Sequence, residues 1–149
     1  MNKNIEELLL KSGYIKRNGA TAESIALAER LFNTTFSNEY KDFLIWSNGG
    51  DFFDGGIELF AINDPTCPPH LLIGFINSPQ RRPESIPKQY IIIGATIFGD
   101  YICLTHGGSI VQWDHEEDKA FNVYNSIYDY CLEFSKCCDP EYIKELFDD

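Results

Sequence analysis

Hydrophobic residues recur every three to four positions along segment 22–32, which is the spacing of one face of an α-helix. Thr21 stands immediately before this segment and can cap its first turn with a side-chain oxygen. A shorter stretch with one apolar face covers about 5–11, and Gly13 interrupts it. The pattern predicts a short helix followed by a capped amphipathic helix.

Segment 37–50 has the features of a helix with defined ends. Ser37 can cap the N-terminus, and Glu39 adds negative charge to the first turn, where the helix dipole favours it. Asn48-Gly49-Gly50 then permits the positive φ values at which helices commonly end. The large apolar residues of this helix and one later tryptophan should pack inside the protein; we expect the core to contain Tyr40, Phe43, Trp46 and Trp113.

The periodicity changes to that of β-strands from residue 57 onward. Residues 57–62 alternate in polarity, whereas 90–93 is almost wholly apolar and predicts a strand in the centre of a sheet. His106-Gly107-Gly108 supplies the glycines of a hairpin turn. The other predicted strands are 101–105, 109–113 and, at an edge of the sheet, 121–124.

Two proline-rich loops flank residues 71–75, a short apolar run that fits either a strand or a helix. Ser126 begins another amphipathic helix, and Asp139-Pro140 opens a final short one. Helices, then strands, then helices predict an α+β fold. We expect a single domain over residues 1–149, with a largely antiparallel mixed sheet flanked by N-terminal and C-terminal helices.

Size and composition indicate a protein that folds without a metal or disulfide. A chain of 149 residues with 44% hydrophobic residues can form a full core. The five cysteines are an odd number, which fits reduced thiols. The first residues lack the basic region of a signal peptide, and no apolar run approaches the ~20 residues that span a bilayer. These features predict a cytoplasmic protein.

The net charge of −11 is distributed along the whole chain. Up to residue 75 ten acids face six Lys and Arg residues, and from 76 onward thirteen acids face six. Such a field repels nucleic acid and anionic membranes and accelerates encounter with a basic partner. Plain solubility is the alternative reason for an acidic surface.

Two cysteine–histidine pairs invite a chemical role, but each has a simpler explanation. Cys67 and His70 have half the spacing of a zinc site, with no second pair at matching spacing, so a proline-rich loop is the better account. Cys103 would lie within a strand and His106 in the next turn, which does not bring a nucleophile and base together. We therefore expect no catalytic residues, no metal site and no cofactor.

Acidic residues gather at two predicted element ends. Asp51 and Asp54 follow the helix stop, where the ligand spacing of a calcium-binding loop is absent, so a turn is the better interpretation of this segment. Phe52 lies between them and should close over the core together with Phe53, and the alternative is that the two rings are exposed as a contact patch. Four acids stand within five residues at the second site, Asp114, Glu116, Glu117 and Asp118. A consecutive run is typical of a solvated turn or a partner contact and rarely forms a catalytic pair.

Three motifs together resemble the SUKH superfamily of immunity proteins. The first is 37–44 leading to Asn48-Gly49-Gly50, similar to the family's tyrosine-x-x-phenylalanine-leucine helix before Asn-Gly-Gly, although Phe36 stands where the family usually has proline. The second is 92–94 followed by 98–104, which looks like the family's Gly-Asp strand. The third, 111–116, is close to its tryptophan-aspartate-histidine strand end. The motifs span about residues 21–136, and none falls in segment 63–89.

The resemblance implies an α+β domain that acts by binding rather than by catalysis. Many bacterial members are immunity proteins that neutralise a toxin domain, often a nuclease, whereas some eukaryotic members regulate cell-wall synthesis. A cognate toxin domain with a basic surface is therefore the expected partner, and a regulatory interaction module is the alternative. On this interpretation the partner contacts are expected at the exposed acids, namely Asp51, Asp54, Asp114, Glu116, Glu117 and Asp118.

Overall fold

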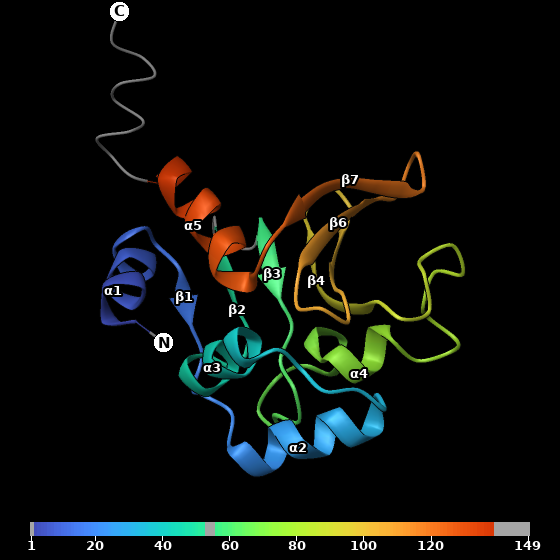
Figure 1. Cartoon of the computed structure of the whole chain (residues 1–149), viewed down its shortest axis with the longest axis horizontal. Coiled ribbons are helices and arrows are strands. Elements are labelled where there is room, and N and C mark those ends of the chain that lie inside the picture. Colours follow the sequence, from blue (N-terminus) through green and yellow to red (C-terminus); the bar gives the residue numbers. More distant parts are fainter. Residues whose placement is uncertain (1, 53–55, 139–149) are drawn as a thin grey trace, which may run out of the picture.

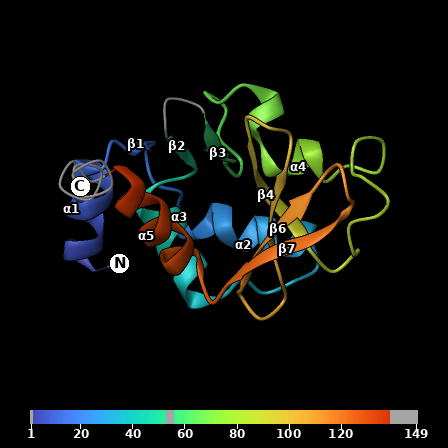
Figure 2. The ribbon, with the colours of Figure 1, turned by 90° about the horizontal axis from the view of Figure 1, so that it is seen from above.

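The computed structural model describes residues 2–52 and 56–138, and the side chains within these ranges up to residue 134. Figures 1 and 2 show helices α1, α3 and α5 gathered at one side of the molecule and strands β4, β6 and β7 at the other. Along the chain the elements are α1 (Lys3–Lys11), β1 (Ile15–Lys16), α2 (Ala22–Leu31), α3 (Asn38–Trp46), β2 (Gly50–Phe52), β3 (Ile57–Leu59), the 3-10 helix η1 (Pro69–Leu71), α4 (Ile73–Ile76), β4 (Ile91–Thr96), β5 (Tyr101–Leu104), β6 (Ile110–Asp114), β7 (Lys119–Tyr124) and α5 (Ile127–Cys138).

The sheet is a seven-stranded meander in which strands follow one another in chain order from β1 to β7. Each neighbouring pair is antiparallel. Within the described residues, parallel pairing is limited to an isolated bridge between Ala61 and Leu72. The α+β class and the largely antiparallel sheet predicted from the sequence are therefore confirmed.

Strand β4 is the central strand, as its apolar sequence predicted. Ile92 and Ile93 point to opposite faces of the sheet, and both are buried. Ile93 lies with Phe43 of α3 and Ile127 of α5 around one small interior gap. Helix α4 packs against the same strand. Since β4 is covered on both faces, it needs apolar residues at successive positions rather than at alternate ones.

The predicted helix caps are present. The side-chain oxygen of Thr21 accepts a hydrogen bond from the backbone N–H of Ser24 at 3.1 Å, and Ser37 accepts one from Tyr40 at 3.3 Å. Ser126 caps α5 by accepting from Asp129 at 3.2 Å. The final helix predicted from Asp139-Pro140 lies outside the described residues. Each cap acts within one turn, which is why the sequence could reveal it.

The predicted core is confirmed for Tyr40, Phe43 and Trp113, which are all buried. Trp46 departs from the prediction because it lies at the margin of the core, half-buried and stacked on Tyr14 at 5.7 Å between ring centroids. Phe52 is fully buried, as expected, and Phe53 lies outside the described residues.

The structure adds two short strands that the sequence did not predict, β1 and β2. They contain two and three residues, which is too short for a recognisable period. The segment after the helix stop was expected to form a turn, but Gly50 pairs with Lys16 of β1 and with Leu59 of β3. The β1–β2 pairing joins residues that are distant in sequence, so only the assembled sheet defines β1.

The region after Leu59 also differs from the prediction. The expected strand over 57–62 ends at Leu59, because the next residues bond to other parts of the chain: Ala61 donates its N–H to the carbonyl of Leu71 and accepts from Ile73. Asn48 holds this bend, since its side chain bonds both the N–H and the carbonyl of Ile62. The ambiguous apolar run at 71–75 forms the end of η1 and most of α4.

Candidate partner-binding site

The meander brings two turns to the same end of the sheet. The β4–β5 turn, residues 97–100, and the β6–β7 turn, residues 115–118, both lie where the even-numbered strands end. Ile97 also donates its N–H to the carbonyl of Gly56, just before β3, at 2.9 Å. We refer to residues 97–100 together with 114–118 as the turn face.

The β6–β7 turn is organised by two of the predicted acids. Asp114 accepts backbone hydrogen bonds from Glu116 at 2.8 Å and Glu117 at 3.1 Å. These bonds, that from Glu117 first, hold the pKa of Asp114 below its usual value, because they stabilise the carboxylate form. Asp118 has a positive φ of 61° and accepts from the indole N–H of Trp113 at 3.0 Å. Asp114 and Asp118 are thus engaged in shaping the turn.

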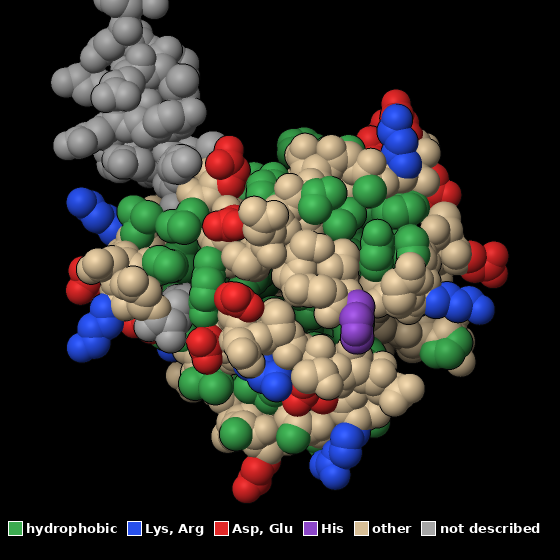
Figure 3. Space-filling model, in the orientation of Figure 1, with side chains coloured by type: hydrophobic (Ala, Val, Ile, Leu, Met, Phe, Trp, Pro, Cys, Tyr) green, Lys and Arg blue, Asp and Glu red, His purple; other side chains and the backbone are tan. Residues whose placement is uncertain are grey.

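The other two predicted acids are exposed to solvent. Glu116 and Glu117 lie on the surface of the turn, and Glu117 forms an exposed ion pair with Lys119 at 2.9 Å. Such a pair contributes little to stability, on the order of 0–1 kcal/mol. Figure 3 shows acidic side chains, together with a basic one, at the tip of this hairpin. Their carboxylates are available for long-range attraction of a cationic surface.

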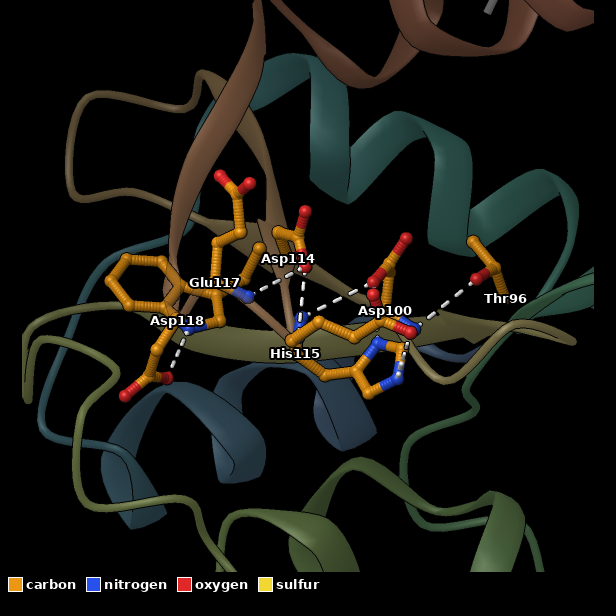
Figure 4. A network of polar contacts seen from close by, with 8 residues as sticks. Thr96, Asp100, Asp114, His115, Glu117 and Asp118 are labelled. Carbon is orange, nitrogen blue, oxygen red and sulfur yellow. Dashed lines mark hydrogen bonds and ion pairs between the residues drawn. The ribbon is translucent and has the colours of Figure 1, made fainter.

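An Asp–His pair connects the two turns (Figure 4). Nδ1 of His115 lies 2.7 Å from Oδ1 of Asp100, which also accepts the backbone N–H of His115 at 3.2 Å. The hydrogen bond to Asp100 raises the pKa of His115 above its usual value. Gly99 is needed beside this ring, since its φ is +93° and a Cβ there would lie 3.3 Å from His115. The sequence placed Asp100 and His115 in separate motifs without indicating this contact.

The β4–β5 turn presents two apolar side chains to solvent. Ile97 is 74% exposed and Phe98 is 80% exposed. Both precede Asp100 in the turn, so they belong to the same end of the molecule as the β6–β7 acids. Sequence reasoning missed them as contact residues, although adjacent Ile and Phe beside Gly99 and Asp100 in a turn were a visible signal. Exposed apolar side chains rimmed by acids are typical of a binding surface.

The remaining predicted acids do not join the turn face directly. Asp51 lies in β2, four strands from β6, which corresponds to roughly 19 Å across the sheet. It is half-buried, and Oδ1 is buried without a hydrogen-bond partner among the described residues. Asp54 lies outside the described residues. The structure therefore gathers Asp114 to Asp118 but leaves Asp51 apart from them.

The candidate chemical sites are now placed by the structure. Cys103 is buried in β5, and burial raises the pKa of its thiol to about 12, while His106 is exposed in the following turn. Cys67 is buried and accepts a hydrogen bond from Arg17 at 2.9 Å, whereas His70 is exposed. The raised pKa keeps the Cys103 thiol protonated, which does not favour a nucleophile, and the Cys67 sulfur is packed in the core.

One group of side chains has the composition of a metal site. Asp100, Asp114 and His115 place potential ligand atoms within 4.8 Å of one another. Hydrogen bonds within the turn face already use Oδ1 of both aspartates and Nδ1 of the histidine. These bonds account for the arrangement without an ion.

In the described part of the chain, no helix is both long and apolar enough to span a bilayer.

Comparison with known proteins places this fold in a family. Residues 19–133, which include all three sequence motifs and the turn face, match the SMI1 / KNR4 family (SUKH-1). The chain is also 30% identical over 87 residues to the uncharacterized protein YnaB of Bacillus subtilis (strain 168). That match covers 58% of this chain and 51% of the relative, so the chain spans about half the length of this curated protein. Because the family match covers most of its length, the protein belongs to the SMI1 / KNR4 family (SUKH-1).

Proposed function

We propose that the protein is an immunity protein, which binds a cognate toxin domain in the cytoplasm through its turn face and neutralises it without catalysing a reaction. Membership of the SUKH family supports an immunity or interaction role. The observation that carries the choice of surface is the exposure of Ile97 and Phe98 next to a hairpin tip rich in acids.

The apolar and acidic parts of the turn face have different roles in this proposal. Burying an Ile or Phe side chain against a partner stabilises a complex by about 1.5–3 kcal/mol each, so Ile97 and Phe98 would be the anchors. Glu116 and Glu117 would attract a basic toxin surface and raise the association rate. A nuclease toxin has such a surface, because it must bind nucleic acid. The Asp100–His115 pair would hold the two turns in one fixed arrangement before binding.

An affinity pull-down from the native host, with the wild-type protein as bait, identifies the partner. Elution with increasing salt then reports how far charge contributes to the complex. Capture of a basic toxin domain that is released at moderate salt would support the proposal. A partner from cell-wall synthesis or signalling would instead favour the regulatory interaction module.

Matched variants then test the surface itself. Ile97→Ser removes an apolar side chain from the turn face, and Leu31→Ser removes one of similar exposure, 69%, from α2. We expect Ile97→Ser to weaken toxin binding by roughly tenfold or more, while Leu31→Ser leaves the affinity unchanged. Equal effects of the two variants would refute the assignment of the turn face.

Charge reversal tests the acids in the same way. Glu116→Lys should slow association with the toxin and reduce its salt dependence, because the exposed carboxylate is replaced by a cation. Glu7→Lys, on the exposed surface of α1, makes the same change in net charge away from the turn face. If both variants slow association equally, net charge alone is responsible, and the assignment of Glu116 as a contact residue is wrong.

A further inference from the structure

A cleft at the opposite end of the sheet has a charge unlike that of the rest of the protein. It lies where β4 begins and β5 ends, and its volume is about 560 Å³, within the range of small-molecule sites. Its walls come from the α2–α3 connection, from the segment around 77–91 that lies beyond α4 in Figure 1, and from the β5–β6 turn. The sequence motifs assigned no role to segment 77–89.

The lining of this cleft is basic. Arg82, Lys88 and His106 all line it, and no carboxylate does so within the described residues. Segment 77–89 contains three basic residues and one acid, a balance of +2 in a chain whose net charge is −11. Acids outnumber Lys and Arg almost two to one overall, so a cleft that is lined by Arg82 and Lys88 and by no described carboxylate is a local departure from the composition.

Arg82 is held in place by neutral groups only. Its guanidinium donates to Oδ1 of Asn77 at 2.8 Å and to the carbonyl of Pro87 at 2.5 Å. In the described part of the chain no carboxylate lies within 4 Å of it. Partial burial lowers the pKa of Arg82, because the charge is desolvated without an acidic partner. An arginine side chain is nevertheless not deprotonated in proteins, so this guanidinium is a cation with further N–H donors for another acceptor.

The group that positions Arg82 is itself fixed. The amide of Asn77 donates to the carbonyls of Ile73 and Ile92, each at 2.8 Å, and accepts the N–H of Ile92 at 2.9 Å. Asn77 thus connects α4 to the start of β4, and its side-chain oxygen also accepts the hydrogen bond from Arg82. A donor held by a rigid support loses little conformational entropy when it binds a ligand.

We propose that this cleft binds a small phosphate monoester. The phosphate would pair with Arg82 and Lys88, because a group with a charge near −2 matches two cations better than a carboxylate does. The organic part would lie against the ring of Phe32 and the side chains of Tyr90 and Ile91, which line the same cleft. This site is separate from the turn face, so it does not depend on the proposed immunity function.

Phenyl phosphate is a suitable probe, and its binding can be followed by two-dimensional NMR of the wild-type protein. We expect saturable shifts centred on the amides of Asn33, Tyr90 and His106. Inorganic phosphate tests whether the organic part of the ligand contributes to binding. Benzoate tests whether the cleft prefers a phosphate to a carboxylate, and phenol tests binding to the apolar wall alone. Each of the three should bind at least about tenfold more weakly than phenyl phosphate.

Lys88→Gln provides the test of the site. Lys88 is exposed and makes no hydrogen bond or ion pair within the described ranges, so this change should leave the fold intact. Lys11→Gln makes the same change on the exposed surface of α1. We expect Lys88→Gln to weaken the binding of phenyl phosphate by about tenfold and Lys11→Gln to leave the affinity unchanged.

The outcomes separate the proposal from non-specific charge effects. Shifts spread over surface lysines, or equal weakening by the two variants, would overturn the site. Benzoate binding as tightly as phenyl phosphate would overturn the phosphate assignment, and equal binding of inorganic phosphate would overturn the role of the apolar wall. Saturable shifts confined to the cleft and lost in Lys88→Gln would support it.

Discussion

Asn48 offers a direct test of how the Asn-Gly-Gly motif stabilises the fold. Its side chain is buried and donates to the carbonyl of Ile62 at 2.7 Å, while it accepts the N–H of Ile62 at 2.8 Å. Ile62 is also buried, so water cannot replace these bonds. Asn48→Ala would leave both backbone groups without a partner. At about 1–3 kcal/mol for each unsatisfied buried group, the expected loss in the free energy of unfolding is roughly 2–6 kcal/mol.

Urea unfolding followed by tryptophan fluorescence and circular dichroism measures this loss. Small domains are stable by only about 5–15 kcal/mol, so the midpoint should fall substantially while the slope with urea stays constant. Asn38→Ala is the matched control, because Asn38 is exposed in the first turn of α3 and should change stability by less than about 0.5 kcal/mol. A loss below about 1 kcal/mol for Asn48→Ala would refute the reasoning.

Three further predictions concern the core, the helix stop and the turn face. Phe43→Ala should cost about 3–5 kcal/mol in urea unfolding, because it leaves a cavity in the core, and a loss below about 1 kcal/mol would place Phe43 outside it. Gly49→Ala should cost about 2 kcal/mol or more in the same assay, since φ is +79° and a Cβ would lie 2.5 Å from the carbonyl oxygen of Leu59; unchanged stability would contradict this geometry. Asp100→Asn should lower the pKa of His115 toward its ordinary value in an NMR titration, and an unchanged pKa would exclude the hydrogen bond as its cause.

The Asp100–His115 pair also predicts a direction for the pH dependence of stability. The pKa of His115 is raised in the folded protein, so protonated His115 is favoured there more than in the unfolded chain. Its contribution is fully present below the unfolded pKa, near 6.5, and is lost as the pH rises through the folded value. The difference in unfolding free energy between wild type and Asp100→Asn should therefore narrow as the pH rises through this window. A constant difference would contradict the linkage.

The features that the sequence determined by itself are local ones. Thr21 and Ser37 mark helix starts because a cap bonds to a backbone N–H within the same turn. The apolar run 90–93 identified the central strand, because burial on both faces requires apolar residues at successive positions. The three motifs also carry enough of the family's pattern to predict that the chain belongs to it.

Part of the candidate site followed from the sequence, and part did not. The run from Asp114 to Asp118 was visible as an acidic strand end, and its position in a turn is confirmed. The place of Ile97 and Phe98 beside Gly99 was a signal of a turn, but the same two side chains could equally have packed inside, so the tertiary structure decided their exposure. Asp51 was expected to be a partner contact like the other acids, but its distance from them depends on the number of strands between β2 and β6.

The tertiary structure alone decided which distant residues meet. Asp100 reaches His115 only because β5 and β6 pair in one register, which aligns the turns on either side of them. Arg82 acquires its neutral support from Asn77 only when α4 packs against β4. Caps and periodicity are set by forces that act within a few residues, whereas these contacts depend on strand register and packing across the whole chain. The sequence therefore determined the family and the longer helices and strands, whereas the assembled sheet determined the short strands β1 and β2 and the two surfaces at its ends.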